Sequence, residues 1–133
     1  MSRWLLQWNP KTWDPGGRPI TDWKVSRYLR ELQPGDDVVL WRGGTEPGVY
    51  GIYRVTAPVV KVEEPRSPDE IALNIRYKLP IEKVRHLVIT KADLIKDPHF
   101  ACHDIVNNPR HRQPNPFRLT DAQWAAIDQR ASR

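Results

Sequence analysis

The N-terminal segment from Arg3 to Trp13 contains the residues best suited to bind a planar ligand. Three of the six tryptophans of the chain lie in it, at positions 4, 8 and 13, and Asn9 stands among them. Indole rings stack on flat molecules, and an amide can hydrogen-bond the polar edge of such a molecule. Because Asn9-Pro10 ends the preceding strand, we expect Trp8, Asn9 and Trp13 at the mouth of a sheet. The alternative is that these rings only fill the core.

Basic side chains flank the tryptophans. The chain carries 21 Lys and Arg residues against 16 Asp and Glu residues, a formal net charge of +5. Cations that contact phosphates give salt-dependent affinity, whereas aromatic rings hold unstacked bases. The pattern favours binding of a single-stranded or flipped base over groove reading by an inserted helix. The expected phosphate contacts are Lys11, Lys24, Arg27, Arg30, Arg42, Arg110 and Arg112. A solvated basic surface is the simpler alternative.

Residue patterns typical of enzymes are weak in this sequence. The glycine pair that follows Arg42 lacks the lysine of a phosphate-binding loop. His99, Cys102 and His103 offer at most three metal ligands without a second pair elsewhere. We therefore expect a binding protein that uses no metal or other cofactor. A nucleotide-processing enzyme that uses His99, His103 or an acidic pair is one alternative, and a module that binds a small molecule or protein is another.

Short strands dominate the elements that would position these residues. Alternating apolar residues predict strands over 3–8, 37–41, 48–56, 71–79 and 84–88, with 59–62 as a continuation of the third. Helices are expected over 22–32 and 91–97 and after the capping box that begins at Thr120, while 99–116 is expected to be irregular. Asp36 should brace the turn before the second strand. Together these expected strands and helices predict one α+β domain over residues 1–133, a mixed β-barrel with short helices closing its ends.

The apolar segments are too short to cross a bilayer, and the N-terminus lacks the apolar stretch of a signal peptide. Cys102 is the single cysteine, so no disulfide framework is expected. These observations predict a cytoplasmic protein without a membrane partner.

Several motifs, taken in order, resemble the EVE domain family. They are Trp4-Leu-Leu-Gln-Trp-Asn-Pro-Lys-Thr-Trp-Asp14, Trp23-Lys-Val25, Pro34-Gly-Asp-Asp-Val-Val-Leu-Trp41, Gly48-Val-Tyr-Gly-Ile-Tyr53 and Asn115-Pro-Phe-Arg-Leu-Thr120. The resemblance implies a PUA-like β-barrel related to YTH domains, which hold a modified base in an aromatic pocket. EVE domains are similarly linked to modified cytosine in DNA.

Carried over to this chain, the resemblance implies that Trp8 and Trp41 form the walls of the pocket. Asn9 and Asn115 would read the polar edges of the base, and Trp13 and Trp23 would be further wall or entrance residues. The chain departs from the family pattern at Pro116, which separates Asn115 from Phe117.

The implied function is a non-enzymatic reader of a flipped or unpaired modified cytosine in DNA, with modified RNA as the alternative ligand. Because some EVE domains are fused to restriction or AAA+ machinery, a separately encoded nuclease or AAA+ protein is the effector that the resemblance would imply.

Overall fold

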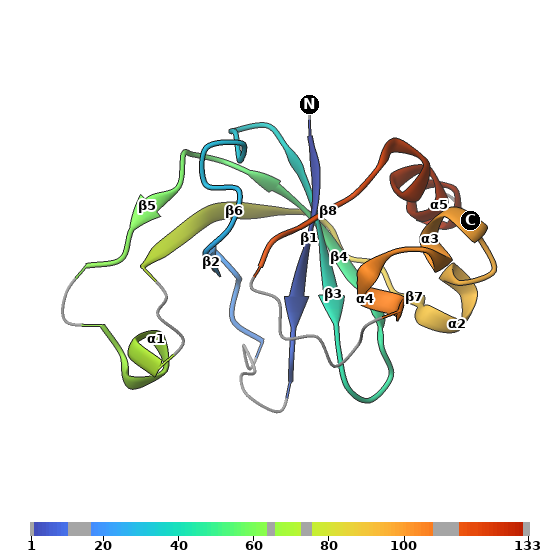
Figure 1. Ribbon diagram of the computed structural model, residues 1–133, viewed down its shortest axis with the longest axis horizontal. Coiled ribbons are helices and arrows are strands. Elements are labelled where there is room, and N and C mark those ends of the chain that lie inside the picture. The colour runs from blue at the N-terminus through green and yellow to red at the C-terminus, as the bar shows by residue number, and fades with distance from the viewer. Residues whose placement is uncertain (1, 11–16, 64–65, 73–75, 108–114, 132–133) are drawn as a thin grey trace.

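The computed structural model describes residues 2–10, 17–63, 66–72, 76–107 and 115–131 (Figure 1). Lys11, Trp13, Arg110 and Arg112 lie outside the described residues, and their roles stay predictions. The elements in chain order are β1 (Arg3–Trp8), β2 (Asp22–Val25), β3 (Asp37–Arg42), β4 (Gly48–Val55), β5 (Val60–Lys61), α1 (Pro68–Ala72), β6 (Tyr77–Arg85), β7 (Ile89–Thr90), α2 (Lys91–Leu94), α3 (Pro98–Ala101), α4 (Asp104–Asn107), β8 (Phe117–Arg118) and α5 (Asp121–Ala131).

The strands form one mixed sheet in the order β2-β6-β4-β3-β1-β8, with β5 paired to β6 and β7 paired to β4. β1 and β3 are parallel, and the other strand pairs are antiparallel. The sheet curls into a half-barrel (Figure 1), and one main-chain hydrogen bond joins its two edges, from the N–H of Ser26 to the carbonyl oxygen of Asn115 (3.0 Å). The predicted α+β class and PUA-like mixed β-barrel are confirmed.

Each face of the sheet carries its own apolar core. The first core packs α2, α3, α4 and α5 against the sheet (right side of Figure 1), and includes Leu5, Val39, Trp41, Phe100 and Ile127. The second core fills the concave side of the curl with Trp4, Leu6, Val38, Leu40 and Leu79. Because consecutive residues of a strand point to opposite faces, β1 supplies Leu5 to the first core and Trp4 and Leu6 to the second.

The helix predicted over 22–32 is wrong. Residues 22–25 form β2, which pairs antiparallel with β6, and Tyr28 adopts a left-handed backbone conformation with φ of 54° that a helix cannot accommodate. The apolar stripe that suggested a helix does face the second core, where Val25 and Leu32 are buried and Tyr28 and Leu29 pack beside them. Strand pairing with β6 therefore overrides a local pattern that fits a helix equally well.

The strand predicted over 71–79 is also wrong at residues 71 and 72, and residues 73–75 lie outside the described ranges. Residues 68–72 form α1, and the strand starts only at Tyr77 and continues to Arg85. A capping box begins the helix: Ser67 Oγ accepts from the N–H of Glu70 (3.2 Å), and a carboxylate oxygen of Glu70 accepts from the N–H of Ser67 (2.8 Å). The region 99–116, expected to be irregular, contains α3 and α4 within its described part.

Local capping and turn predictions are confirmed. The N–H of Asp93 donates to Thr90 Oγ1 at the start of α2 (3.2 Å), and Thr120 and Gln123 exchange two hydrogen bonds before α5. Asp36 braces its turn, because its buried carboxylate accepts from the N–H of Gln33 (3.0 Å). No helix within the described ranges is long and apolar enough to span a bilayer.

Candidate functional site

Trp8 and Trp41 lie on opposite faces of the sheet. In the parallel register of β1 and β3, Gln7 pairs with Trp41 and Trp8 pairs with Arg42. Paired residues of neighbouring strands share a face, so Trp41 faces the first core with Gln7, whereas Trp8 packs against the second core. The two indoles cannot form opposing walls of one slot, and this part of the predicted pocket is corrected.

Trp41 is built into the first core. Only 2% of its surface is exposed, and its ring stacks on Phe100 with centroids 5.7 Å apart and planes inclined by 28°. A base could stack on Trp41 only by displacing Phe100, which is itself fully buried. Trp41 therefore stabilises the packing of α3 on the sheet, and it offers no open ring face in this conformation.

Trp23 joins Trp8 on the second core. Both rings are half-buried against this core, as are Tyr77 and Tyr28, but Tyr28 packs on Trp4 with ring centroids 5.3 Å apart, towards the other end of β1 from Trp8. Asn9, next to Trp8, is exposed. Trp8, Trp23 and the exposed residue Asn9 define what we call the rim of the second core.

Asn115 holds the two sides of this rim together. Its side-chain amide makes two hydrogen bonds to the main chain of Gln7, accepting from the N–H (2.7 Å) and donating to the carbonyl oxygen (3.1 Å). Its own carbonyl oxygen accepts from Ser26, just after β2, and its peptide bond to Pro116 is cis. Both polar atoms of the Asn115 side chain are thus used to join β1 to the strand-like segment before β8, a role that the sequence did not reveal.

We call the hydrogen bonds that join Asn115 to Gln7 and to Ser26 the seam, and its direction places Trp23 towards the Trp8 end of β1. Ser26 bonds to Asn115, and the next residue, Arg27, donates from Nη2 to the carbonyl oxygen of Pro116 (3.0 Å). The two segments therefore run in the same direction, and β8 is antiparallel to β1. Trp23, three residues before Ser26, consequently lies towards the end of β1 that carries Trp8 and Asn9.

Arg42 lies among aromatic rings at the same end of the sheet. Its guanidinium carbon is 5.6 Å from the ring centroid of Trp8 and 5.4 Å from that of Tyr50, and the two rings meet edge to face with centroids 6.3 Å apart. Cation–π contacts hold a guanidinium without neutralising it. Arg42 therefore keeps a positive charge beside Trp8, where the sequence predicted a phosphate contact.

Arg27 has a structural role in addition to its predicted contact with phosphate. The guanidinium carbon of Arg27 lies 5.2 Å from the ring centroid of Tyr28 and 5.3 Å from that of Phe117. The guanidinium carbon of Arg118 lies 4.5 Å from the same Tyr28 ring and 5.2 Å from the Trp4 ring. Alternating rings and guanidinium groups thereby tie the segment after β2 to β8. Sequence reasoning missed this ladder because its members are about 90 residues apart.

The remaining predicted cations are placed differently. Arg30 is exposed, whereas Lys24 is half-buried in β2. Hydrogen bonds from Ser67 lower the pKa of Glu70, and the ammonium groups of Lys24 and Lys78 act in the same direction. The ammonium group of Lys24 therefore acts on the Glu70 carboxyl of α1.

His103, a candidate catalytic residue, uses both ring nitrogens in hydrogen bonds to the main chain. His103 is 6% exposed; its Nδ1 accepts from the N–H of Ile105 (3.0 Å), which leaves the proton on Nε2 to be donated to the carbonyl oxygen of Arg118 (2.9 Å). Burial lowers the pKa of His103, because the charged imidazolium is disfavoured away from water. In the part of the chain that the structure describes, no three His, Cys, Asp or Glu side chains gather as metal ligands.

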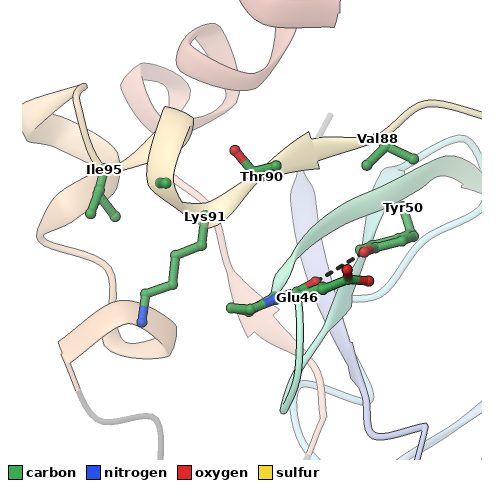
Figure 2. Close-up of a pocket in the computed structure, with 8 residues that line it drawn as sticks. Glu46, Tyr50, Val88, Thr90, Lys91 and Ile95 are labelled. Carbon is green, nitrogen blue, oxygen red and sulfur yellow. Dashed lines mark hydrogen bonds between the residues drawn. The ribbon is translucent and has the colours of Figure 1, made fainter.

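Two cavities lie beside the β3–β4 connection and the start of α2. A small cavity of about 100 Å³ is lined by Gln7, Trp41, Gly43, Gly44, Pro47, Lys91 and Ile105. A wider groove of about 590 Å³ adjoins it (Figure 2) and is lined by Glu46, Pro47, Tyr50, Val88, Thr90, Lys91, Ala92 and Ile95. Gln7 and Lys91 were missed from the sequence, because only the strand register and the packing of α2 bring them together.

Comparison with known proteins gives a consistent result. The model of the EVE domain matches residues 2–130, and no curated protein matches the chain. A hypothetical protein from Leishmania major is 18% identical, with 100% of this chain and 98% of that chain covered and a TM-score of 0.72. A Pseudomonas syringae protein is 20% identical, with 96% and 98% covered and a TM-score of 0.72.

A third similar structure is that of the human THYN1 protein in complex with DNA that contains 5-methylcytosine. It is 17% identical, with 100% of this chain and 99% of that chain covered and a TM-score of 0.67. At these identities the likeness shows a shared fold, over nearly the full length of each chain.

Proposed function

The chain belongs to the EVE domain family, and from that premise we propose that it binds DNA carrying a modified cytosine and does so without catalysis. The proposed site is the aromatic rim of the second core, where Trp8 and Trp23 lie on either side of the seam that Asn115 closes. The complex of the similarly folded human THYN1 protein with 5-methylcytosine DNA supports the choice of ligand.

The observation that carries the proposal is the gathering of half-buried rings, an exposed amide and a cation at one end of the half-barrel. A base turned out of the duplex loses its stacking partners, and indole faces replace them. We expect the exposed Asn9 to hydrogen-bond the edge of that base, and Arg42, whose guanidinium lies beside Trp8, to contact a flanking phosphate. Trp41 has no part in this site.

Binding without catalysis accords with how the titratable side chains are used. Both ring nitrogens of His103 bond to the main chain, and the Asp36 carboxylate accepts from Trp4 Nε1, Ser2 N and Gln33 N. A general base must reach a proton of the substrate, and neither group is oriented to do so. Stacking and hydrogen bonding at the rim require no such group.

The test compares the affinity for one duplex with 5-methylcytosine at a single position and for the same duplex with cytosine there. We expect the wild-type protein to prefer the methylated duplex. Trp23→Leu keeps apolar volume but removes the flat ring, and should weaken binding of the methylated duplex by about 5- to 150-fold, because one stacked base contributes roughly 1–3 kcal/mol.

Trp124→Leu is the matched control. Trp124 is also half-buried, but it lies in α5 against the first core, with the Arg3 guanidinium 5.2 Å from its ring. Its replacement should leave the affinity and the preference for methylated DNA unchanged. Equal affinity of the wild-type protein for both duplexes, or equal losses in the two variants, would contradict the proposal.

A further inference from the structure

The small cavity beside Trp41 is lined by hydrogen-bond donors that have no partner among the described residues. Neither the side-chain amide of Gln7, nor the indole N–H of Trp41, nor the ammonium group of Lys91 makes a hydrogen bond or ion pair with the described residues. An indole N–H and an ammonium group can only donate. No carboxylate stands among the described lining residues, and the Gln7 amide can donate as well as accept, so these groups can together satisfy an anion.

The strand register fixes two of these donors, Gln7 and Trp41, on one side of the sheet. Gln7 and Trp41 are register partners, and Asn115 holds the main chain of Gln7 from both its N–H and its carbonyl oxygen. Gly43 forms the wall opposite the amide: a Cβ at this position would lie 3.3 Å from Gln7 Nε2. The amide therefore lies against a bare backbone, which leaves room that a side chain would take.

Lys91 stands at the boundary between the cavity and the wider groove. Its N–H donates to the carbonyl oxygen of Pro47 (2.9 Å), which fixes the start of α2 on the β3–β4 connection. Figure 2 shows its side chain extended, with the ammonium group turned away from Glu46. The positive charge is thus left for a ligand rather than paired across the groove, and the groove gives that ligand a way in.

We propose that this cavity binds a phosphoryl group, with the Lys91 ammonium, the Gln7 amide and the Trp41 indole N–H as its donors. A cavity of about 100 Å³ suits a group of that size, since drug-sized ligands occupy pockets of roughly 300–1,000 Å³. The phosphoryl group comes either from a nucleic-acid strand, in which case this inference rests on the proposed function, or from free phosphate.

The first experiment titrates the full chain with inorganic phosphate and follows the Trp41 indole N–H by NMR, with chloride at matched ionic strength as the reference. We expect a saturable shift with phosphate alone. Lys91→Met should abolish it and Lys91→Arg should retain it. Lys96→Met is the matched control, because Lys96 is an exposed lysine of the neighbouring turn that lines neither cavity, and it should leave the shift unchanged.

The second experiment measures how the affinity for a DNA duplex depends on salt in the two methionine variants. Loss of one phosphate contact lowers the magnitude of the slope of log K against log salt by about 0.9. A smaller slope for Lys91→Met than for Lys96→Met assigns the phosphoryl group to the strand, whereas equal slopes with a saturable phosphate shift assign it to free phosphate.

The absence of a saturable shift, together with equal slopes, would overturn the phosphate site. That result would leave the base-reading function intact if the wild-type protein still prefers methylated DNA. Conversely, a phosphate-dependent shift without such a preference would support the cavity and remove the proposed function.

Discussion

Replacing Asn115 by alanine tests the seam that closes the half-barrel. The substitution removes two hydrogen bonds to Gln7, at 2.7 and 3.1 Å, and leaves a partly buried N–H and carbonyl group of β1 without a partner. Each bond contributes about 1 kcal/mol net, and each group left unsatisfied in a buried position costs about 1–3 kcal/mol. Because the site is only partly buried, we expect a loss of about 2–4 kcal/mol in the free energy of unfolding.

Urea denaturation followed by tryptophan fluorescence would measure this loss. In a chain of this length it corresponds to a fall in melting temperature of roughly 3–5 °C per kcal/mol. Asn107→Ala is the control, since Asn107 makes one exposed hydrogen bond to the carbonyl oxygen of Ala101 (3.1 Å) and should cost under about 0.5 kcal/mol. If Asn115→Ala unfolds at the same urea concentration as Asn107→Ala yet loses affinity for methylated DNA, Asn115 reads the base and the seam argument fails.

Two further predictions concern buried polar groups. Asp36→Ala should cost about 3 kcal/mol or more in a urea titration, because it removes the charged acceptor of the Trp4 indole (3.0 Å) and of the Gln33 N–H (3.0 Å); a loss below about 1 kcal/mol would show that this carboxylate is dispensable. Because burial lowers the pKa of His103 below its usual 6.5, the unfolded chain binds more protons, and stability should fall as pH decreases below about 6.5. Urea midpoints from pH 8 to 5 should show a weaker dependence in His103→Gln than in the exposed-site control His99→Gln, and identical profiles would contradict the assignment.

Local patterns predicted the strands that form the centre of the sheet. β1, β3 and β4 follow the expected ranges closely, because apolar residues alternate in each and turns bound them. The helix starts at Thr90 and Thr120 were also predictable, since a cap involves only residues within one turn. The same signal is present at Ser67 and Glu70, but the apolar alternation that follows favours a strand there.

Long-range pairing decided what local patterns could not. The stripe of Val25 and Leu32 fits a helix or an irregular segment on a core, and only the neighbouring β6 selects the strand. Likewise, β1 and β3 each looked like two-sided strands, but which tryptophans share a face depends on their register. A shift of one residue would have placed Trp8 and Trp41 together, so the sequence alone could not exclude the pocket that the structure corrects.

The most direct test of the central claim is to map where a methylated oligonucleotide contacts the protein. Uniformly ¹⁵N-labelled protein would be titrated with a duplex containing 5-methylcytosine, and main-chain and indole N–H shifts would be followed. We predict that the largest shifts fall on Trp8, Asn9 and Trp23 at the rim of the second core, and depend on the methyl group. Methyl-dependent shifts confined to the first core around Trp41 and Phe100 would contradict the account.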